Sequence, residues 1–208
     1  MEVYETEEQQ VEAVKKWLKE NGMSLILGVV VGLSSVGGWK YYQSEQKTHN
    51  LQASDMYMSL LSQMAVSKDE ADFNAQVDQL ASKYSDTPYA ALASLMLAKH
   101  DYEKGNVQAA ISKLSWASKN ATDIETQQVA QTRLIRVYLS ESMYDEAQAL
   151  LNTPHPESFD AVYEELKGDM HLDKNELAQA RVAYDKAIVL SGDGVSSWLQ
   201  TKRQQLGN

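Results

Sequence analysis

The 208-residue sequence contains no cysteine. Without cysteine the chain cannot form disulfide bonds, thiolate zinc sites or iron–sulfur clusters, and it has no cysteine nucleophile. Basic residues are also scarce, since 19 Lys and Arg stand against 29 Asp and Glu and give a formal net charge of −10. Such an acidic chain lacks the basic surface that neutralises phosphates, so we expect no nucleic-acid partner.

Catalytic motifs are lacking as well. The sequence has no P-loop, no G-x-G-x-x-G motif and no G-x-S-x-G motif. The histidines do not have the spacing of metal ligands; they are His49, His100, His155 and His171. We therefore expect no catalytic residue, no metal or cofactor site and no small-molecule substrate.

Charged residues are absent from residues 21–39, and this gap divides the chain into three parts. We predict an acidic N-terminal segment over residues 1–22, a transmembrane helix over residues 23–42 and a helical domain over residues 43–208. The 19 uncharged residues span about 28 Å as a helix, close to the thickness of the bilayer hydrocarbon. Trp17 precedes the stretch and Trp39 ends it, as is typical of aromatic rings at membrane interfaces.

Two alternatives compete with a membrane helix. A buried helix of a soluble protein is disfavoured because five of the ten glycines fall in this stretch, and glycine weakens helices in water. A cleaved signal peptide is disfavoured because the preceding residues are acidic and no small-x-small cleavage site follows. We therefore expect a single-pass anchor.

The lysines that flank the stretch indicate its orientation. Lys15, Lys16 and Lys19 lie on the N-terminal side, whereas Lys40 and Lys47 lie on the C-terminal side. Because the side richer in lysine stays in the cytoplasm, we expect a cytoplasmic N-terminus and a domain on the far side of the membrane.

Within the anchor, Gly28 and Gly32 form a G-x-x-x-G pattern. Such small residues allow two membrane helices to approach closely, so this face is a candidate contact with another membrane helix. The alternative is that glycine is simply frequent in membrane helices.

Residues 43–208 show helical periodicity and no sustained strand alternation, which predicts an all-α fold. Similar units place Ala110, Ala147 and Ala180 at equivalent positions, 37 and 33 residues apart. This spacing is near the roughly 34-residue period of tetratricopeptide repeats (TPR), in which a small residue lets two helices cross closely. We predict a TPR-like α-solenoid of helical hairpins rather than a generic helical bundle, and expect Gly168 at another close crossing.

Local signals predict where individual helices begin and end. Capping-box patterns at Ser67-x-x-Glu70 and Thr122-x-x-Glu125 are expected to open two helices. Before the repeats, residues 51–65 and 69–84 are expected to form a degenerate leading pair. After them, we expect a terminal helix over residues 196–206, in which Trp198 covers the exposed edge of the last pair.

Several segments carry a specific resemblance. They are Met1–Tyr4, Gln10–Lys15, Glu20–Gly22, Gly38–Tyr42, Tyr89–Leu95, Arg133–Val137 and Leu166–Asp169. The chain resembles, over nearly its whole length, the YfgM family of bacterial inner-membrane proteins.

That resemblance implies a cytoplasmic N-terminus, one transmembrane helix and a periplasmic TPR-like domain in the bacterial inner membrane. It further implies a non-enzymatic ancillary subunit of the SecYEG translocon, which works with the periplasmic chaperone PpiD on newly exported polypeptides. The family also suggests an alternative, a regulator of envelope stress signalling whose N-terminal segment sequesters a cytoplasmic signalling protein. A helix over residues 7–18 would place Val11, Val14 and Leu18 on one face for such docking, or against the lipid surface.

By analogy with TPR proteins, the concave surface of the solenoid would bind proteins through the first helix of each pair. The candidate residues are Leu95, Lys99, Tyr102, Thr132, Arg136 and Leu139. The alternative for these positions is ordinary packing of the apolar members and solvation of the charged ones.

Overall fold

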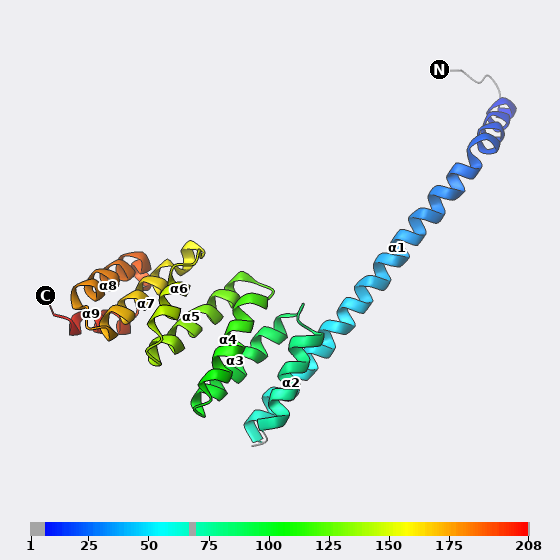
Figure 1. Ribbon diagram of the computed structural model, residues 1–208. Coiled ribbons are helices and arrows are strands. Elements are labelled where there is room, and N and C mark those ends of the chain that lie inside the picture. The colour runs from blue at the N-terminus through cyan, green and yellow to red at the C-terminus, as the bar shows by residue number, and fades with distance from the viewer. Residues whose placement is uncertain (1–6, 67–69, 208) are drawn as a thin grey trace. The chain divides into compact units, whose positions relative to one another are not determined.

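The computed structural model describes residues 7–66 and 70–207 (Figure 1). The described residues form α-helices and two short 3-10 helices, with no strand among them, so the all-α prediction is confirmed. The helices are α1 (Glu7–Val66), α2 (Glu70–Lys83), α3 (Pro88–Glu103), α4 (Val107–Asn120), α5 (Ile124–Ser140), α6 (Tyr144–Leu151), α7 (Asp160–Asp173), α8 (Leu177–Ser191) and α9 (Ser197–Gln205). The 3-10 helices are η1 (Glu157–Phe159) and η2 (Gly192–Gly194).

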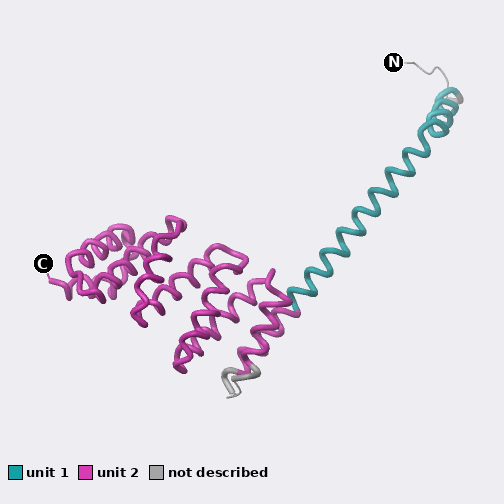
Figure 2. The backbone as a smooth tube through the Cα atoms, in the orientation of Figure 1, with its two compact units in different colours: residues 1–51 teal, residues 52–208 magenta. Residues whose placement is uncertain are grey.

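The chain divides into two compact units, residues 1–51 and residues 52–208 (Figure 2). The helix α1 continues from the first unit into the second, so the borders expected near residues 22 and 42 both fall inside one helix. Residues 43–50 contain neither proline nor glycine, which explains why no break occurs there.

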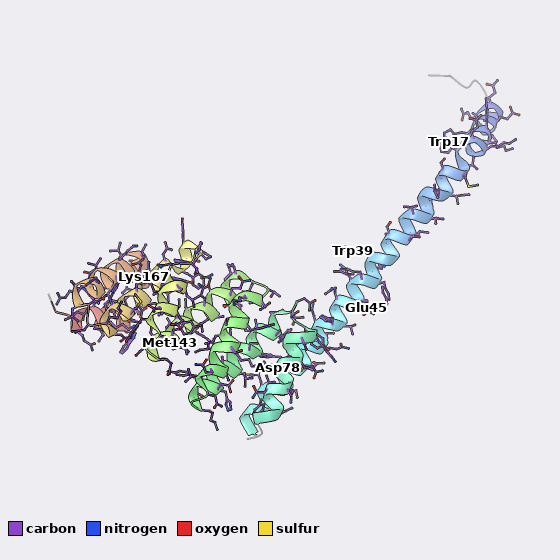
Figure 3. All side chains as sticks on the ribbon, viewed as in Figure 1. Trp17, Trp39, Glu45, Asp78, Met143 and Lys167 are labelled. Carbon is purple, nitrogen blue, oxygen red and sulfur yellow. The ribbon has the colours of Figure 1, made fainter. Side chains whose placement is uncertain are left out.

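In the first unit, the middle of α1 exposes its apolar side chains. Ile26, Leu27 and Leu33 are more than 60% exposed, and none of the most apolar window of the helix is buried. Trp17 and Trp39 project outward from α1 (Figure 3), with 54% and 62% of their surface exposed. This is the one described helix that is long and apolar enough to cross a membrane.

In the second unit, consecutive helices pack as hairpins that stack on one another. The expected leading pair is present, but its first helix is the C-terminal end of α1 and not a separate helix. Ala53 and Leu60 of α1 pack with Phe73 and Val77 of α2 and with Leu97 of α3 in one buried cluster. The pairs α3–α4, α5–α6 and α7–α8 follow, and α5 also contacts α7.

The repeated alanines are buried where the helices cross, as predicted. Ala110, Ala147 and Ala180 lie in α4, α6 and α8, the second helices of their pairs, and each is 0% exposed. Small side chains at these crossings let the helix axes approach closely, which is the packing logic of the repeat.

The turns between paired helices repeat with the same spacing as the alanines. Gly105, Ser142 and Asn175 all adopt left-handed conformations, with φ of 82°, 58° and 59°. In each turn the next residue donates its backbone N–H to the carbonyl five residues before it, at 2.7–2.8 Å. The helices α3, α5 and α7 therefore end in the same Schellman-type turn, which shows the repeat in the backbone itself.

Two local predictions are wrong, and one lies outside the described residues. The helix α5 is capped by Asp123 and not by Thr122, since a carboxylate oxygen of Asp123 accepts from the Thr126 backbone N–H at 2.7 Å. Trp198 is 64% exposed, whereas Leu199 is 2% exposed and fills the end of the stack. Ser67, the expected cap of α2, is not among the described residues.

Candidate functional site

Two neighbouring cavities follow α3 and α5, the first helices of consecutive pairs. One cavity has a volume of about 340 Å³ and is lined by Leu95, Ala98, Lys99, Tyr102, Leu114, Arg133, Arg136, Val137 and Ser140. The other has a volume of about 380 Å³ and is lined by Tyr57, Leu92, Leu95, Met96, Glu125, Thr126, Val129 and Arg133. Because they share Leu95 and Arg133, we treat these cavities as one surface, the α3/α5 groove.

Helical periodicity places these side chains on one face of each helix. On α5, Arg133, Arg136 and Ser140 follow one another at intervals of three and four residues, which aligns them along the groove. The two residues between the arginines are buried on either side of the helix. Leu134 packs in the cluster of α3, α4 and α5, and Ile135 packs in the cluster of α5, α6 and α7.

The groove has an apolar floor and a basic rim. Leu95, Leu114 and Val137 form part of the floor and are at most 9% exposed. At one end, the Tyr102 hydroxyl donates to Ser140 Oγ at 2.9 Å and links α3 to α5. The groove is thus an apolar depression between two helices that are linked by a hydrogen bond, with charged side chains at its edge.

The rim charges are open to solvent. The Lys99 ammonium lies 3.7 Å from Glu103, but their side chains are 74% and 62% exposed, so this pair stabilises the fold very little. Arg133 and Arg136 are exposed and have no hydrogen-bond or ion-pair partner in the described part of the chain. Lys99, Arg133 and Arg136 thus form a local basic site in a chain of net charge −10. Glu125 lines the other end of the groove.

The structure brings together four of the six residues that the sequence suggested. Leu95, Lys99, Tyr102 and Arg136 all line the first cavity.

Thr132 and Leu139 lie elsewhere on α5. Thr132 is 5% exposed and its hydroxyl donates to the Val129 carbonyl at 3.1 Å. Leu139 is 6% exposed and packs in the cluster of α5, α6 and α7. Both positions precede a groove residue by one, Arg133 and Ser140, which on a helix is a rotation of about 100°.

Sequence reasoning also missed Arg133, Val137 and Ser140. Their signal is their spacing from Arg136, because positions 133, 136, 137 and 140 follow the i, i+3, i+4, i+7 pattern of one helix face.

The second candidate contact lies in α1. Gly28 and Gly32 are exposed, and a Cβ atom built on either would meet nothing within 4 Å. The face that they form is therefore open to a second helix.

Ion pairs near the C-terminal end hold neighbouring helices together. The Lys202 ammonium of α9 donates to Glu165 Oε1 at 2.7 Å and to Asp169 Oδ1 at 2.7 Å, both in α7. Burial alone would lower the pKa of Lys202, but the hydrogen bonds to Asp169 and Glu165 outweigh it and raise this pKa. These contacts fix α9 to α7.

A second ionic contact joins α7 to α8. Glu164 Oε1 accepts from Lys167 at 2.7 Å and from Lys186 at 2.9 Å. Burial works to raise the pKa of Glu164, but the two lysines outweigh it and lower the pKa. Among residues 7–66 and 70–207 no group of three or more His, Asp or Glu side chains is arranged to hold a metal ion.

Stacked hairpins with this repeat define a tetratricopeptide repeat-like protein. In agreement, residues 15–208 match the family described as "Tetratricopeptide repeat-like domain".

Similar proteins of known name place the chain in one family of tetratricopeptide repeat-like proteins. An Escherichia coli K12 protein is 33% identical over 188 residues, 90% of each chain, and a Haemophilus influenzae protein is 32% identical over 181 residues, 87% of this chain and 88% of the relative. A Neisseria gonorrhoeae protein is 26% identical over 182 residues, 88% of this chain and 87% of the relative. All three are named "Ancillary SecYEG translocon subunit". The chain belongs to this family, the YfgM family, as its resemblance predicted. No solved structure matches it.

Proposed function

We propose that this protein is a membrane-anchored, non-enzymatic ancillary subunit of the SecYEG translocon. The observation that carries the proposal is its similarity to proteins of that name along about 90% of both chains. An ancillary subunit needs a means of staying at the translocon and a surface for other proteins. The exposed apolar part of α1 and the α3/α5 groove are suited to these two tasks.

In this proposal α1 crosses the bacterial inner membrane once. Residues 1–22 are cytoplasmic, residues 23–42 span the membrane and residues 43–208 are periplasmic. The flanking lysines support this orientation, because three precede the apolar stretch and two follow it. Gly28 and Gly32 are the proposed contact with a membrane helix of the translocon or of PpiD.

The periplasmic domain would bind PpiD and newly exported polypeptides and so support periplasmic chaperoning. The family resemblance supports these partners. The groove supports protein binding, because it combines buried apolar side chains with arginines that have no partner among residues 7–66 and 70–207. Among the residues proposed to contact partners, Leu95, Lys99, Tyr102 and Arg136 lie in the groove. Thr132 and Leu139 would act only by supporting α5.

Site-directed photocrosslinking in intact membranes tests the proposal. A photoreactive residue at Lys99 or Arg136 is expected to crosslink to PpiD or to a radiolabelled secretory protein arrested during export. The same residue at Lys119, exposed in α4 and outside the groove, is the matched control. Co-purification in mild detergent must also recover SecYEG, and its absence would contradict the proposal.

A second function, sequestration of a cytoplasmic signalling protein, is favoured by one observation. Val11, Val14 and Leu18 are 52%, 63% and 54% exposed on the N-terminal part of α1. This apolar face would dock a protein or lie on the lipid surface. Deletion of residues 2–16 separates the functions: loss of stress regulation with intact SecYEG association supports the second, and the reverse supports the first.

A further inference from the structure

The α3/α5 groove has a polarity along its length. Glu125 lines only the second cavity, Arg133 lines both cavities, and Arg136 lines only the first. Lys99, from the facing helix α3, adds a third positive charge to the first cavity. One end of the groove is therefore basic and the other end carries a carboxylate.

We propose that this groove binds an extended polypeptide segment whose apolar side chains enter the two cavities and whose acidic residues pair with Lys99, Arg133 and Arg136. The acidic end of the segment lies over the first cavity, and its uncharged end lies near Glu125. The inference rests on the proposed function, because it specifies which segments of exported polypeptides the domain prefers.

The cavities account for the apolar part of this preference. Leu95 and Val137 give the first cavity an aliphatic lining. Leu92 and Met96 give the second cavity an aliphatic group and a thioether. Volumes of about 340 and 380 Å³ lie at the small end of the range for ligand sites, about 300–1,000 Å³. They accommodate side chains of an extended segment rather than a folded surface.

The arginines account for the acidic part. A guanidinium binds a carboxylate through two parallel hydrogen bonds, and this geometry gives specificity as well as affinity. Neither Arg133 nor Arg136 has a partner in the part of the chain that the structure describes, so neither guanidinium must leave an internal ion pair before a ligand binds. Lys99 would exchange only its solvent-exposed contact with Glu103. A lysine-rich segment would instead meet repulsion from three cations at the first cavity.

Peptide binding to the full chain in detergent micelles or nanodiscs tests this preference. The probe is a short fluorescent peptide with leucine and phenylalanine in its centre and an aspartate cluster at one end. The comparison peptide carries lysines in place of the aspartates. Fluorescence anisotropy is expected to show that the aspartate peptide binds at least about tenfold more tightly, equivalent to about 1.4 kcal/mol.

Two double variants locate the binding. R133E/R136E is expected to weaken binding of the aspartate peptide about tenfold, because two favourable charge pairs become repulsive. K83E/K119E changes the net charge equally at exposed positions outside the groove and is expected to leave the affinity unchanged. Equal binding of the two peptides, or an equal effect of the two variants, would overturn the proposal, as would failure of both peptides to bind.

The outcome is separable from that of the proposed function. If an arrested secretory protein crosslinks to the domain only from positions outside the groove, the groove proposal is wrong while the proposed function stands. If the groove binds acidic peptides but SecYEG is never recovered with the chain, the proposed function fails and the peptide preference stands.

Discussion

Gly168 of α7 lies against the ring of Tyr184 of α8 so closely that a Cβ atom at Gly168 would overlap ring carbons Cδ1 and Cε1. Tyr184 is fully buried, and its hydroxyl donates to Asp169 Oδ1 at 2.7 Å. The last pair of the solenoid therefore has Tyr184 at the position that Leu114 and Leu151 occupy in the preceding pairs. The ring fits because Gly168, the residue of α7 that faces it, has no side chain.

Gly168→Ala is therefore expected to lower the free energy of unfolding by about 2 kcal/mol, since overpacking a dense core forces neighbours apart. Urea denaturation followed by circular dichroism measures the change. Gly194→Ala is the control, because a Cβ there would meet nothing within 4 Å. Equal free energies of unfolding for the two variants would contradict this prediction, because they would show that α7 and α8 can move apart without loss of stability.

Lys202 holds the terminal helix through Glu165 and Asp169. Lys202→Met leaves two partly buried carboxylates without their cation, which is expected to cost about 2 kcal/mol. Hydrogen exchange of the α9 amides should accelerate, while exchange in α3 and α4 stays the same. Lys119→Met, at an exposed position, is the control. Unchanged protection of α9 would mean that its other contacts, such as Leu199 and the ion pair of Arg203 with Asp185, hold the helix without Lys202.

Acid is expected to destabilise the domain through Glu164. Burial favours the neutral form, but Lys167 and Lys186 outweigh it, so the folded pKa lies below the ordinary value of 4.5. The stabilisation is therefore fully present above pH 4.5 and is lost as the pH falls through the folded pKa. The melting temperature should fall more steeply below pH 4.5 in the wild type than in Glu164→Gln. Parallel curves for the two proteins would contradict this assignment.

The anchor is expected to contact its membrane partners through its glycine face. Replacing both Gly28 and Gly32 with leucine should reduce recovery of SecYEG in mild detergent without changing the melting of the domain. Gly37→Leu is the control, since Gly37 lies about 180° around the helix from Gly28. If both changes reduce recovery equally, the contact does not depend on this face.

Much of the fold could be predicted because it leaves local signals. The buried alanines recur near the repeat period, since every pair of helices needs a small residue at its crossing. The sequence predicts the apolar stretch and the first repeat helix as separate elements, whereas in the structure both belong to α1. No proline or glycine between them stops the helix.

The groove could be predicted only in part. On α3, Leu95, Lys99 and Tyr102, which the sequence suggests as contacts for partner proteins, all line the first cavity. The helix α5 is buried on two sides, through Leu134 and Ile135, so its apolar pattern does not indicate which polar positions remain exposed. That assignment depends on how α5 packs between its neighbours, which requires the tertiary structure.

The most direct test of the account asks on which side of the membrane each end lies. Because the chain has no cysteine, Gln10→Cys and Ser158→Cys each introduce a single thiol, at exposed positions before and after the apolar stretch. A membrane-impermeant maleimide added to intact spheroplasts should label Ser158→Cys at once and Gln10→Cys only after lysis. Labelling of Gln10→Cys in intact spheroplasts, with Ser158→Cys protected, would contradict the proposed anchor orientation and the periplasmic role built on it.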